Sequence, residues 1–311
     1  MVWVFWGTNA GGTNFTSWAN TNNLGTNATG NLSTNITGLT ADTPYYYTFY
    51  ATNSAGHAWA TPVTNFTALS DTADWACKMK IQFSGYNKLE TLTNFPAMVA
   101  FTNGMCTNTF WYDWFSSTNG WDLRFRNSNE TTVLNYEVEK WNTGGTSYVW
   151  VQVPQFASNS WIWAYWGNSS ATSAPAVYTT NGATWDSTFA GVWHLSSSNG
   201  AGNFPDSTAN GRVATNYASS NVVGWIGDAR SFVGSPQYLG MSSISVTGEV
   251  TASAWVKGSD YSKDGEIITK NGNWSLFFQE GPSAKGALTW RGAGGAFAIC
   301  LGAAVTLDGN D

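Results

Sequence analysis

The stretch SYVWVQVPQFASNSWIWAYW, residues 147–166, decides the fold class of this chain. Valine recurs at every second position from Ser147 to Val153, and aromatic residues crowd the run from Trp161 to Trp166. The Ala-Ser-Asn-Ser segment between the runs is a turn signal. A period of two with β-branched and aromatic residues is typical of β-strands. The sequence therefore predicts strands at Ser147–Val153 and Trp161–Trp166.

The same pattern continues on both sides of this stretch, and helical periodicity is almost absent. Turn signals fall about every ten residues, as sandwiches and jelly rolls require. The expected fold class is therefore all-β, with tandem β-sandwich or jelly-roll domains. Further strands are expected at Tyr45–Ala51, Lys78–Phe83, Ala97–Phe101, Ala252–Val256 and Trp274–Phe278.

Composition narrows the class of protein. Charged residues make up 10% of the 311 residues, against about a quarter in ordinary globular proteins. Aromatic residues reach 16%, with 19 Trp, which argues against disorder. A net charge of −6 without a basic stripe makes nucleic acid a poor partner. The sequence has no apolar run long enough to span a membrane, so no membrane insertion is expected.

Two composition breaks predict domain boundaries. Residues 69–74 and residues 168–188 are rich in small and polar residues, as loops between domains are. Three units follow: 1–69, 75–167 and 189–311. Each has the turn spacing of a β domain.

The first unit contains GLTADTPYYYTFYATNSAG, residues 38–56. This segment resembles the end of a fibronectin type III domain. The resemblance implies a tyrosine corner at Tyr45, with Tyr45, Tyr47 and Phe49 on one face of a strand. The residues Asn53–Gly56 are then a hairpin turn. Such a domain needs more chain than precedes Gly38, so we expect only its C-terminal part here.

The second unit contains GWDLRFRNSNETTVLNYEVEKW, residues 120–141, and WIWAYWGN, residues 161–168. These elements resemble an uncharacterised bacterial extracellular domain that commonly precedes LamG-like domains. The characteristic segments are Asp122–Phe125, Tyr136–Trp141 and Tyr165–Asn168. The resemblance implies no established activity.

The third unit contains VWHL at 192–195, DSTANG at 206–211 and SAWV at 253–256. Their order and spacing resemble the opening strands of a LamG or concanavalin A-like jelly roll. The resemblance implies a fold that often binds carbohydrate. We expect this domain to be truncated at its C-terminus.

The three cysteines, Cys77, Cys106 and Cys300, have neither metal-binding spacing nor an even number. Buried or half-buried thiols are the favoured interpretation, and a Cys77–Cys106 bridge is left open. The N-terminus lacks the features of a signal peptide. Since the resemblances are to extracellular domains, we expect an extracellular or cell-surface location, with any export signal upstream.

No catalytic residue is expected. Glu137 and Glu139 are two apart on a strand, so they share a face, as the acid and nucleophile of a retaining glycosidase do. A solvent-facing pair is the favoured interpretation. His57 and His194 have no Ser or Cys partner in the sequence, so no triad can be drawn. His194 is expected to be a hydrogen-bonded core or face residue.

Two candidate sites lie in the third unit. Asp206 and Asn210 carry the oxygen ligands that Ca²⁺ prefers, but the same turn is also typical of an Asx-turn that caps its own backbone. Trp225, Trp274 and Trp290 stand beside Gly, Asn or charged residues, which favours exposed platforms for sugar rings. Trp193 and Trp255 are expected in the core.

These features lead to one preferred function and two alternatives. The preferred hypothesis is a non-catalytic extracellular segment that binds polysaccharide or another glycan, or mediates adhesion, within a larger bacterial surface or secreted protein. The first alternative is a set of ancillary modules of a polysaccharide-degrading enzyme whose catalytic domain lies elsewhere. The second is a purely structural surface repeat.

Overall fold

The structure, a computed structural model, describes residues 1–26, 30, 32–40, 43–68, 74–196, 202–242, 244, 251–257, 265–270, 274–278, 288–291 and 297–298. Among the described residues, strands hold 39% and helical turns 5%, and no helix has seven residues or more, which confirms the all-β sandwich class. No described helix is long and apolar enough to cross a membrane. The chain divides into two compact units, Met1–Gln237 and Tyr238–Asp311.

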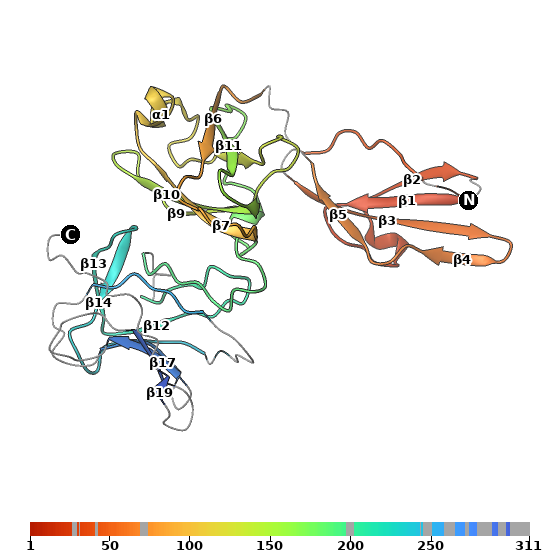
Figure 1. Cartoon of the computed structure of the whole chain (residues 1–311). Helices are drawn as coiled ribbons and strands as arrows, with labels where there is room; N and C mark the ends of the chain where they lie inside the picture. The colour runs from red at the N-terminus through yellow and green to blue at the C-terminus, as the bar shows by residue number, and fades with distance from the viewer. Residues whose placement is uncertain are drawn as a thin grey trace. The chain divides into compact units, whose positions relative to one another are not determined.

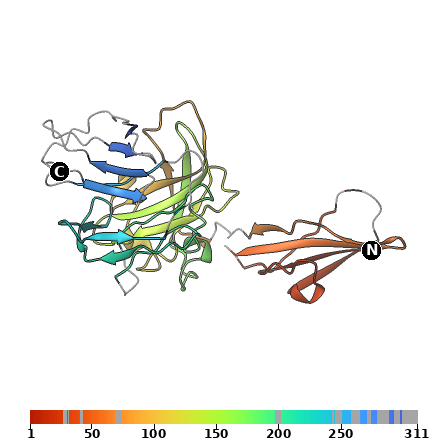
Figure 2. The same ribbon diagram turned by 90° about the horizontal axis from the view of Figure 1, so that it is seen from below.

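The first sheet is antiparallel and has five strands in the order β2-β1-β3-β4, with β5 also paired to β3 (Figures 1 and 2). Its elements are β1 (Val2–Gly7), the short 3-10 turn η1 (Phe15–Ser17), β2 (Asn20–Gly25), β3 (Pro44–Asn53), β4 (Gly56–Trp59) and β5 (Thr64–Thr67). Among the described strands, β1–β5 pair only with one another.

The tyrosine corner expected in the first sheet is present. The backbone N–H of Thr40 donates a hydrogen bond to the Tyr45 hydroxyl at 3.0 Å. Tyr47 contacts both Phe49 and Phe66 through its ring, so the expected aromatic face is also confirmed. The hairpin from β3 to β4 closes with the backbone of Asn53 opposite Gly56, as expected.

The central part of the chain is a sandwich of two three-stranded antiparallel sheets, β6-β11-β8 and β7-β10-β9 (Figure 1). Its elements are β6 (Cys77–Gln82), β7 (Leu92–Phe101), α1 (Met105–Asn108), η3 (Tyr112–Trp114), β8 (Arg124–Arg126), β9 (Tyr136–Lys140), β10 (Ser147–Phe156) and β11 (Trp161–Trp166).

The two sheets bury their facing side chains in one core. Val149 and Val151 of β10 are fully buried, and so are Ala164 and Trp166 of β11. The alternation seen in the sequence decides this arrangement, because every second side chain of a strand points to the same face. Side chains at the alternate positions, such as Trp150 and Trp163, lie on the outer faces of the sheets.

The described residues in the rest of the first compact unit form short elements only. They are η4 (Val177–Thr179), β12 (Thr215–Tyr217), β13 (Ser220–Val223) and β14 (Asp228–Ser231), with β13 and β14 paired antiparallel. The second compact unit contains β15 (Tyr238–Gly240) and an antiparallel sheet in the order β16-β17-β18-β19. The strands of that sheet are β16 (Gly265–Lys270), β17 (Trp274–Phe278), β18 (Leu288–Arg291) and β19 (Phe297–Ala298).

Three sequence expectations are wrong. No strand is present at Val192–Leu195 or at Ala252–Val256, because neither segment pairs its backbone with a neighbouring strand. The interpretation of buried or half-buried thiols holds for Cys77, which is half-buried, and is wrong for Cys106, which is exposed. Both thiols are free, so no bridge joins them. Cys300 lies outside the described residues.

Candidate functional site

The outer face of the β9–β10 pair is covered by a later part of the chain. Trp150 lies opposite Glu137 in the strand register, which puts both side chains on that face. The Gln152 side-chain amide donates hydrogen bonds to the backbone carbonyls of Ala183 and Thr184, at 3.0 and 3.2 Å. We call residues 183–196 and 202–207 the covering segment. It brings His194 and Ser207 against β9.

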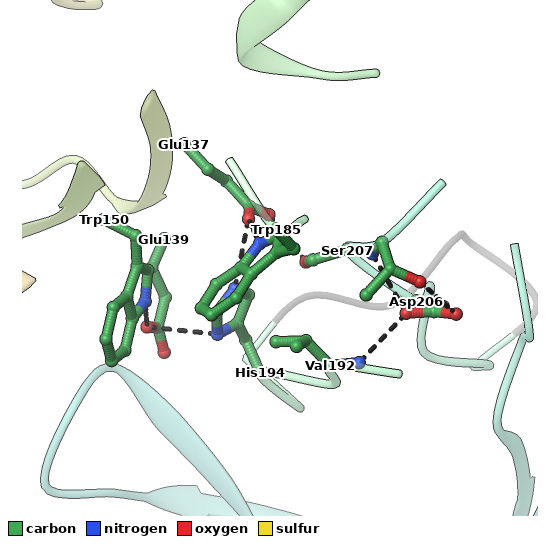
Figure 3. Close-up of polar contacts among 9 residues, drawn as sticks. Glu137, Glu139, Trp150, Trp185, Val192, His194, Asp206 and Ser207 are labelled. Carbon is green, nitrogen blue, oxygen red and sulfur yellow. Dashed lines mark hydrogen bonds and ion pairs between the residues drawn. The ribbon is translucent and has the colours of Figure 1, made fainter. Parts of the chain in front are cut away.

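His194 lies between the two carboxylates that the sequence places on one strand face (Figure 3). Its Nδ1 is 3.2 Å from Glu139 Oε2, and its Nε2 is 3.5 Å from Glu137 Oε2. The second contact is an ion pair rather than a hydrogen bond, since Nε2 has no hydrogen-bond partner. The side chains of His194 and Glu139 are 14% and 4% exposed. The interpretation of a solvent-facing pair is therefore wrong.

Two tryptophans complete the cluster. The Nε1–H of Trp150 donates to Glu139 Oε2 and that of Trp185 donates to Glu137 Oε2, both at 2.6 Å. The Trp150 ring lies nearly parallel to the imidazole, with ring centroids 6.0 Å apart. We call these five residues, Glu137, Glu139, Trp150, Trp185 and His194, the His194 cluster.

The cluster favours the protonated imidazole. Burial by itself lowers the pKa of His194, because it disfavours the charged form. The contacts and charges of Glu137 and Glu139 outweigh burial and raise that pKa to about 9. At neutral pH the buried group is therefore a cation that bridges two carboxylates, and the expectation of a bonded core histidine is confirmed.

The space beside the cluster is small. A cavity of about 60 Å³ is lined by Glu137, Val138, Glu139, His194, Leu195, Ser196, Pro205 and Ser207. Pockets that enclose organic ligands are usually about 300–1,000 Å³. The cavity therefore has room for water but not for a sugar ring.

The polar groups of the His194 cluster are arranged neither as a catalytic triad nor as the open carboxylate pair of a retaining glycosidase. The Ser207 hydroxyl donates to Glu137 Oε1 at 2.6 Å, so it is bonded to the acid and not to the histidine that would activate it. A retaining glycosidase leaves the gap between its carboxylates open to the sugar. Here the imidazole of His194 fills that gap.

The turn at Asp206 has the geometry of an Asx-turn, in which the side chain caps backbone N–H groups. Asp206 Oδ1 accepts the backbone N–H groups of Val192 and Thr208, both at 3.0 Å, and Oδ2 accepts Thr208 Oγ1 and the Arg212 N–H at 2.9 and 3.1 Å. The Asn210 side-chain amide donates to the carbonyls of Phe189 and Ala190. Among the described residues, no group of three His, Cys, Asp or Glu could hold a metal ion. A calcium site here stays a prediction.

The three tryptophans expected to bind sugar are divided between the two compact units. Trp225 follows β13 and is 69% exposed. Trp274 and Trp290 belong to β17 and β18 of the second compact unit, and the description does not extend to their side chains.

The two tryptophans expected in the core are not buried there. Trp193 is half-buried and donates its Nε1–H to the Arg212 carbonyl at 2.6 Å. Trp255 is 76% exposed, because its segment forms no strand that would press it against a sheet.

Sequence reasoning missed the His194 cluster because its members are far apart in the chain. Glu137 is 48 residues from Trp185 and 70 from Ser207. The only local signal was the Glu-Val-Glu spacing of β9. That spacing predicts that the two carboxylates share a face. It does not indicate that a later segment covers the face, so it could not identify His194.

Comparison with known proteins supports one of the three resemblances. Residues 119–191 match the family model described as Domain of unknown function (DUF2341). The matched range holds β8–β11 and both glutamates of the His194 cluster. No curated protein and no solved structure matches the chain. An uncharacterised domain in the second unit is therefore confirmed, while the fibronectin type III and LamG resemblances stay predictions.

Proposed function

We propose that this chain is a non-catalytic, carbohydrate-binding or adhesion segment of a larger extracellular or cell-surface protein. The observation that carries the proposal is the closure of the Glu137–Glu139 gap by His194. These carboxylates are the pair at glycosidase-like spacing in the sequence. With their oxygens bonded to two indoles and an imidazole, they serve to fix the covering segment on β9.

The surface chemistry supports a glycan as the partner. Charged residues are only 10% of the chain, so hydroxyl and amide groups supply most of the polar surface. Sugar hydroxyls exchange hydrogen bonds with such groups, and exposed aromatic rings stack on the apolar faces of sugars. Trp225, 69% exposed, is one such ring.

The test combines binding and hydrolysis on the full chain. Affinity electrophoresis through gels with neutral or acidic polysaccharides measures binding, and a reducing-end assay on the same polymers measures hydrolysis. We expect retardation by at least one polymer and no release of reducing ends. Release that disappears in Glu137→Gln or Glu139→Gln would overturn the non-catalytic role. Failure of every polymer to retard the chain would overturn the glycan-binding role.

A further inference from the structure

The outer face of the β6-β11-β8 sheet combines lysines with aromatic rings. In the register, Tyr165 lies opposite Lys78 and Trp163 opposite Lys80. The Lys78 ammonium stands 3.9 Å from the centre of the Trp163 ring, and the Lys80 ammonium 4.5 Å from the centre of the Trp161 ring. We call these five residues, Lys78, Lys80, Trp161, Trp163 and Tyr165, the Lys–Trp face.

The lysines and tryptophans of the Lys–Trp face reach solvent, whereas Tyr165 is 2% exposed. Lys78 and Lys80 are exposed, and Trp161 and Trp163 are half-buried. Their neighbours on β11, Ile162 and Ala164, point the other way into the core. The face is thus a fixed part of a strand pair and not a loop. Cation–π contacts hold the two ammonium groups in place over the rings.

This face concentrates positive charge in an acidic protein. The chain has 13 Lys and Arg in total and a net charge of −6. The face carries two of these cations, and Arg124 and Arg126 of β8 lie directly across from Tyr165 and Trp163. A basic patch on a protein of negative net charge attracts an anion locally.

The four cations differ in the hydrogen bonds and ion pairs that they form within the protein. Arg124 donates to the carbonyls of Trp121 and Leu123, and Lys78 pairs with Glu130 at 2.6 Å. Hydrogen bonds from Lys78 and Tyr165 lower the pKa of Glu130, so that carboxylate stays charged and offsets Lys78.

Arg126 is buried and donates to the Glu130 carbonyl at 3.1 Å. Within the described residues Lys80 forms no ion pair. Lys80 is therefore the cation with the greatest capacity for an external anion.

A groove adjoins the face at Trp161. It has a volume of about 430 Å³ and is lined by Asn127, Ser128, Asn129, Val153, Pro154, Gln155, Ser158, Asn159, Ser160, Trp161 and Ile162. Its size lies within the range of ligand pockets. Most of its lining is amide and hydroxyl, which both donate and accept hydrogen bonds as sugar hydroxyls require.

We propose that the Lys–Trp face and the adjoining groove bind an anionic polysaccharide, with Lys80 on an acidic group of the polymer and Trp161 against a sugar ring. The proposal rests on the proposed function and names its site and ligand class. The three chemistries present together are an aromatic ring, amides and a cation without an ion pair to any described residue, which fit a sugar that carries carboxylate or sulfate. The arrangement differs from a nucleic-acid site, which needs several unpaired cations along a backbone.

The test measures binding of polygalacturonate and of an uncharged galactan to the full chain, by calorimetry at low and high salt. We expect polygalacturonate to bind, and more weakly as salt screens the Lys80 contact. Lys80→Met should weaken binding roughly tenfold, as loss of one charge-assisted contact does. Trp161→Ala should weaken it by a similar factor, and Trp161→Phe, which keeps a ring, should restore part of it.

Two variants elsewhere serve as controls. Lys88→Met removes another exposed lysine from the loop after β6, and Trp114→Ala removes an exposed tryptophan outside the face, with no assigned role in binding. Both should leave polygalacturonate binding unchanged. Thermal unfolding of each variant verifies that it is folded.

Specific outcomes overturn the inference and separate it from the proposed function. Unchanged polygalacturonate binding in Lys80→Met and Trp161→Ala would overturn the site. Equal binding of poly-L-glutamate would show charge attraction alone and overturn the ligand class. Binding of the uncharged galactan only would overturn the inference while the proposed function stands. No binding to either polysaccharide would count against both.

Discussion

At the scale of single residues, the characteristic segments of the second unit have structural tasks. Asp122 is fully buried, and its carboxylate accepts the backbone N–H groups of Ser116, Ser117 and Gly167 at 2.8, 3.2 and 2.8 Å. Gly167 has φ +83, and an added Cβ would lie 3.1 Å from Ala76 and Trp114. Asp122 and Gly167 belong to segments 45 residues apart, and the hydrogen bond from the Gly167 N–H to the Asp122 carboxylate joins these segments.

The first prediction follows from these bonds. Asp122→Ala leaves three backbone donors without their acceptor, and a hydrogen bond to a charged group contributes about 1.5–3 kcal/mol. We expect the free energy of unfolding to fall by at least about 3 kcal/mol, measured by urea denaturation. Asp113→Ala is a suitable control, since Asp113 is exposed. A loss below about 1 kcal/mol in Asp122→Ala would contradict this account.

At the scale of elements, strands could be predicted where apolar and polar side chains alternate, because the alternation shows which face of the strand is buried. The expected strands at Trp161–Trp166 and Trp274–Phe278 coincide with β11 and β17. The alternation does not show which segment covers the buried face or which strand pairs with the strand. Val192–Leu195 has a strand-like sequence, yet it is part of the covering segment on the outer face of β9–β10.

The candidate sites were predictable to the same extent: a pattern within one strand could be found, but its partner from another segment could not. Glu137 and Glu139 were found from their spacing, but their partner His194 was not. The Lys–Trp face was missed although Lys78-x-Lys80 and Trp161-x-Trp163 both have a period of two. Each motif alone reads as an ordinary amphipathic strand. Only the pairing of β6 with β11 makes one face of them.

The second prediction concerns the pH dependence of the covering segment. The pKa of His194 is raised to about 9 in the folded chain, against about 6.5 when unfolded. A raised pKa means that the cluster stabilises the fold fully below pH 6.5. This stabilisation, on the order of 3 kcal/mol, declines as the pH rises from 6.5 and is lost above about 9.

The measurement is the free energy of unfolding from pH 6 to pH 10. His194→Gln should remove most of the decline, whereas His57→Gln should not, because His57 is exposed in the first sheet. Glu139→Gln breaks a buried ion pair and should cost about 3 kcal/mol at pH 7. An identical pH profile for His194→Gln and the unchanged chain would refute the role of the cluster.

At the scale of the whole molecule, the segment at 168–188 is a packed part of the chain. Its composition suggested a linker, since it is rich in Asn, Ser, Ala and Thr. Yet Tyr178 and Trp185 are 8% and 7% exposed. Tyr178 contacts Tyr136 of the sandwich core through its ring. Residues up to Gln237 belong to the first compact unit.

The last prediction tests this arrangement by limited proteolysis of the full chain with chymotrypsin, which cuts after aromatic residues. Cleavage requires local opening, so we expect the bonds after Tyr178 and Trp185 to survive while the bond after the exposed Trp225 is cut early. Mass spectrometry identifies the fragments. Glu139→Gln loosens the covering segment and should speed the cut after Trp185 without changing the cut after Trp225. Early cleavage after Tyr178 in the unchanged chain would mean that composition had indicated the linker correctly and that the segment is not held by the sandwich.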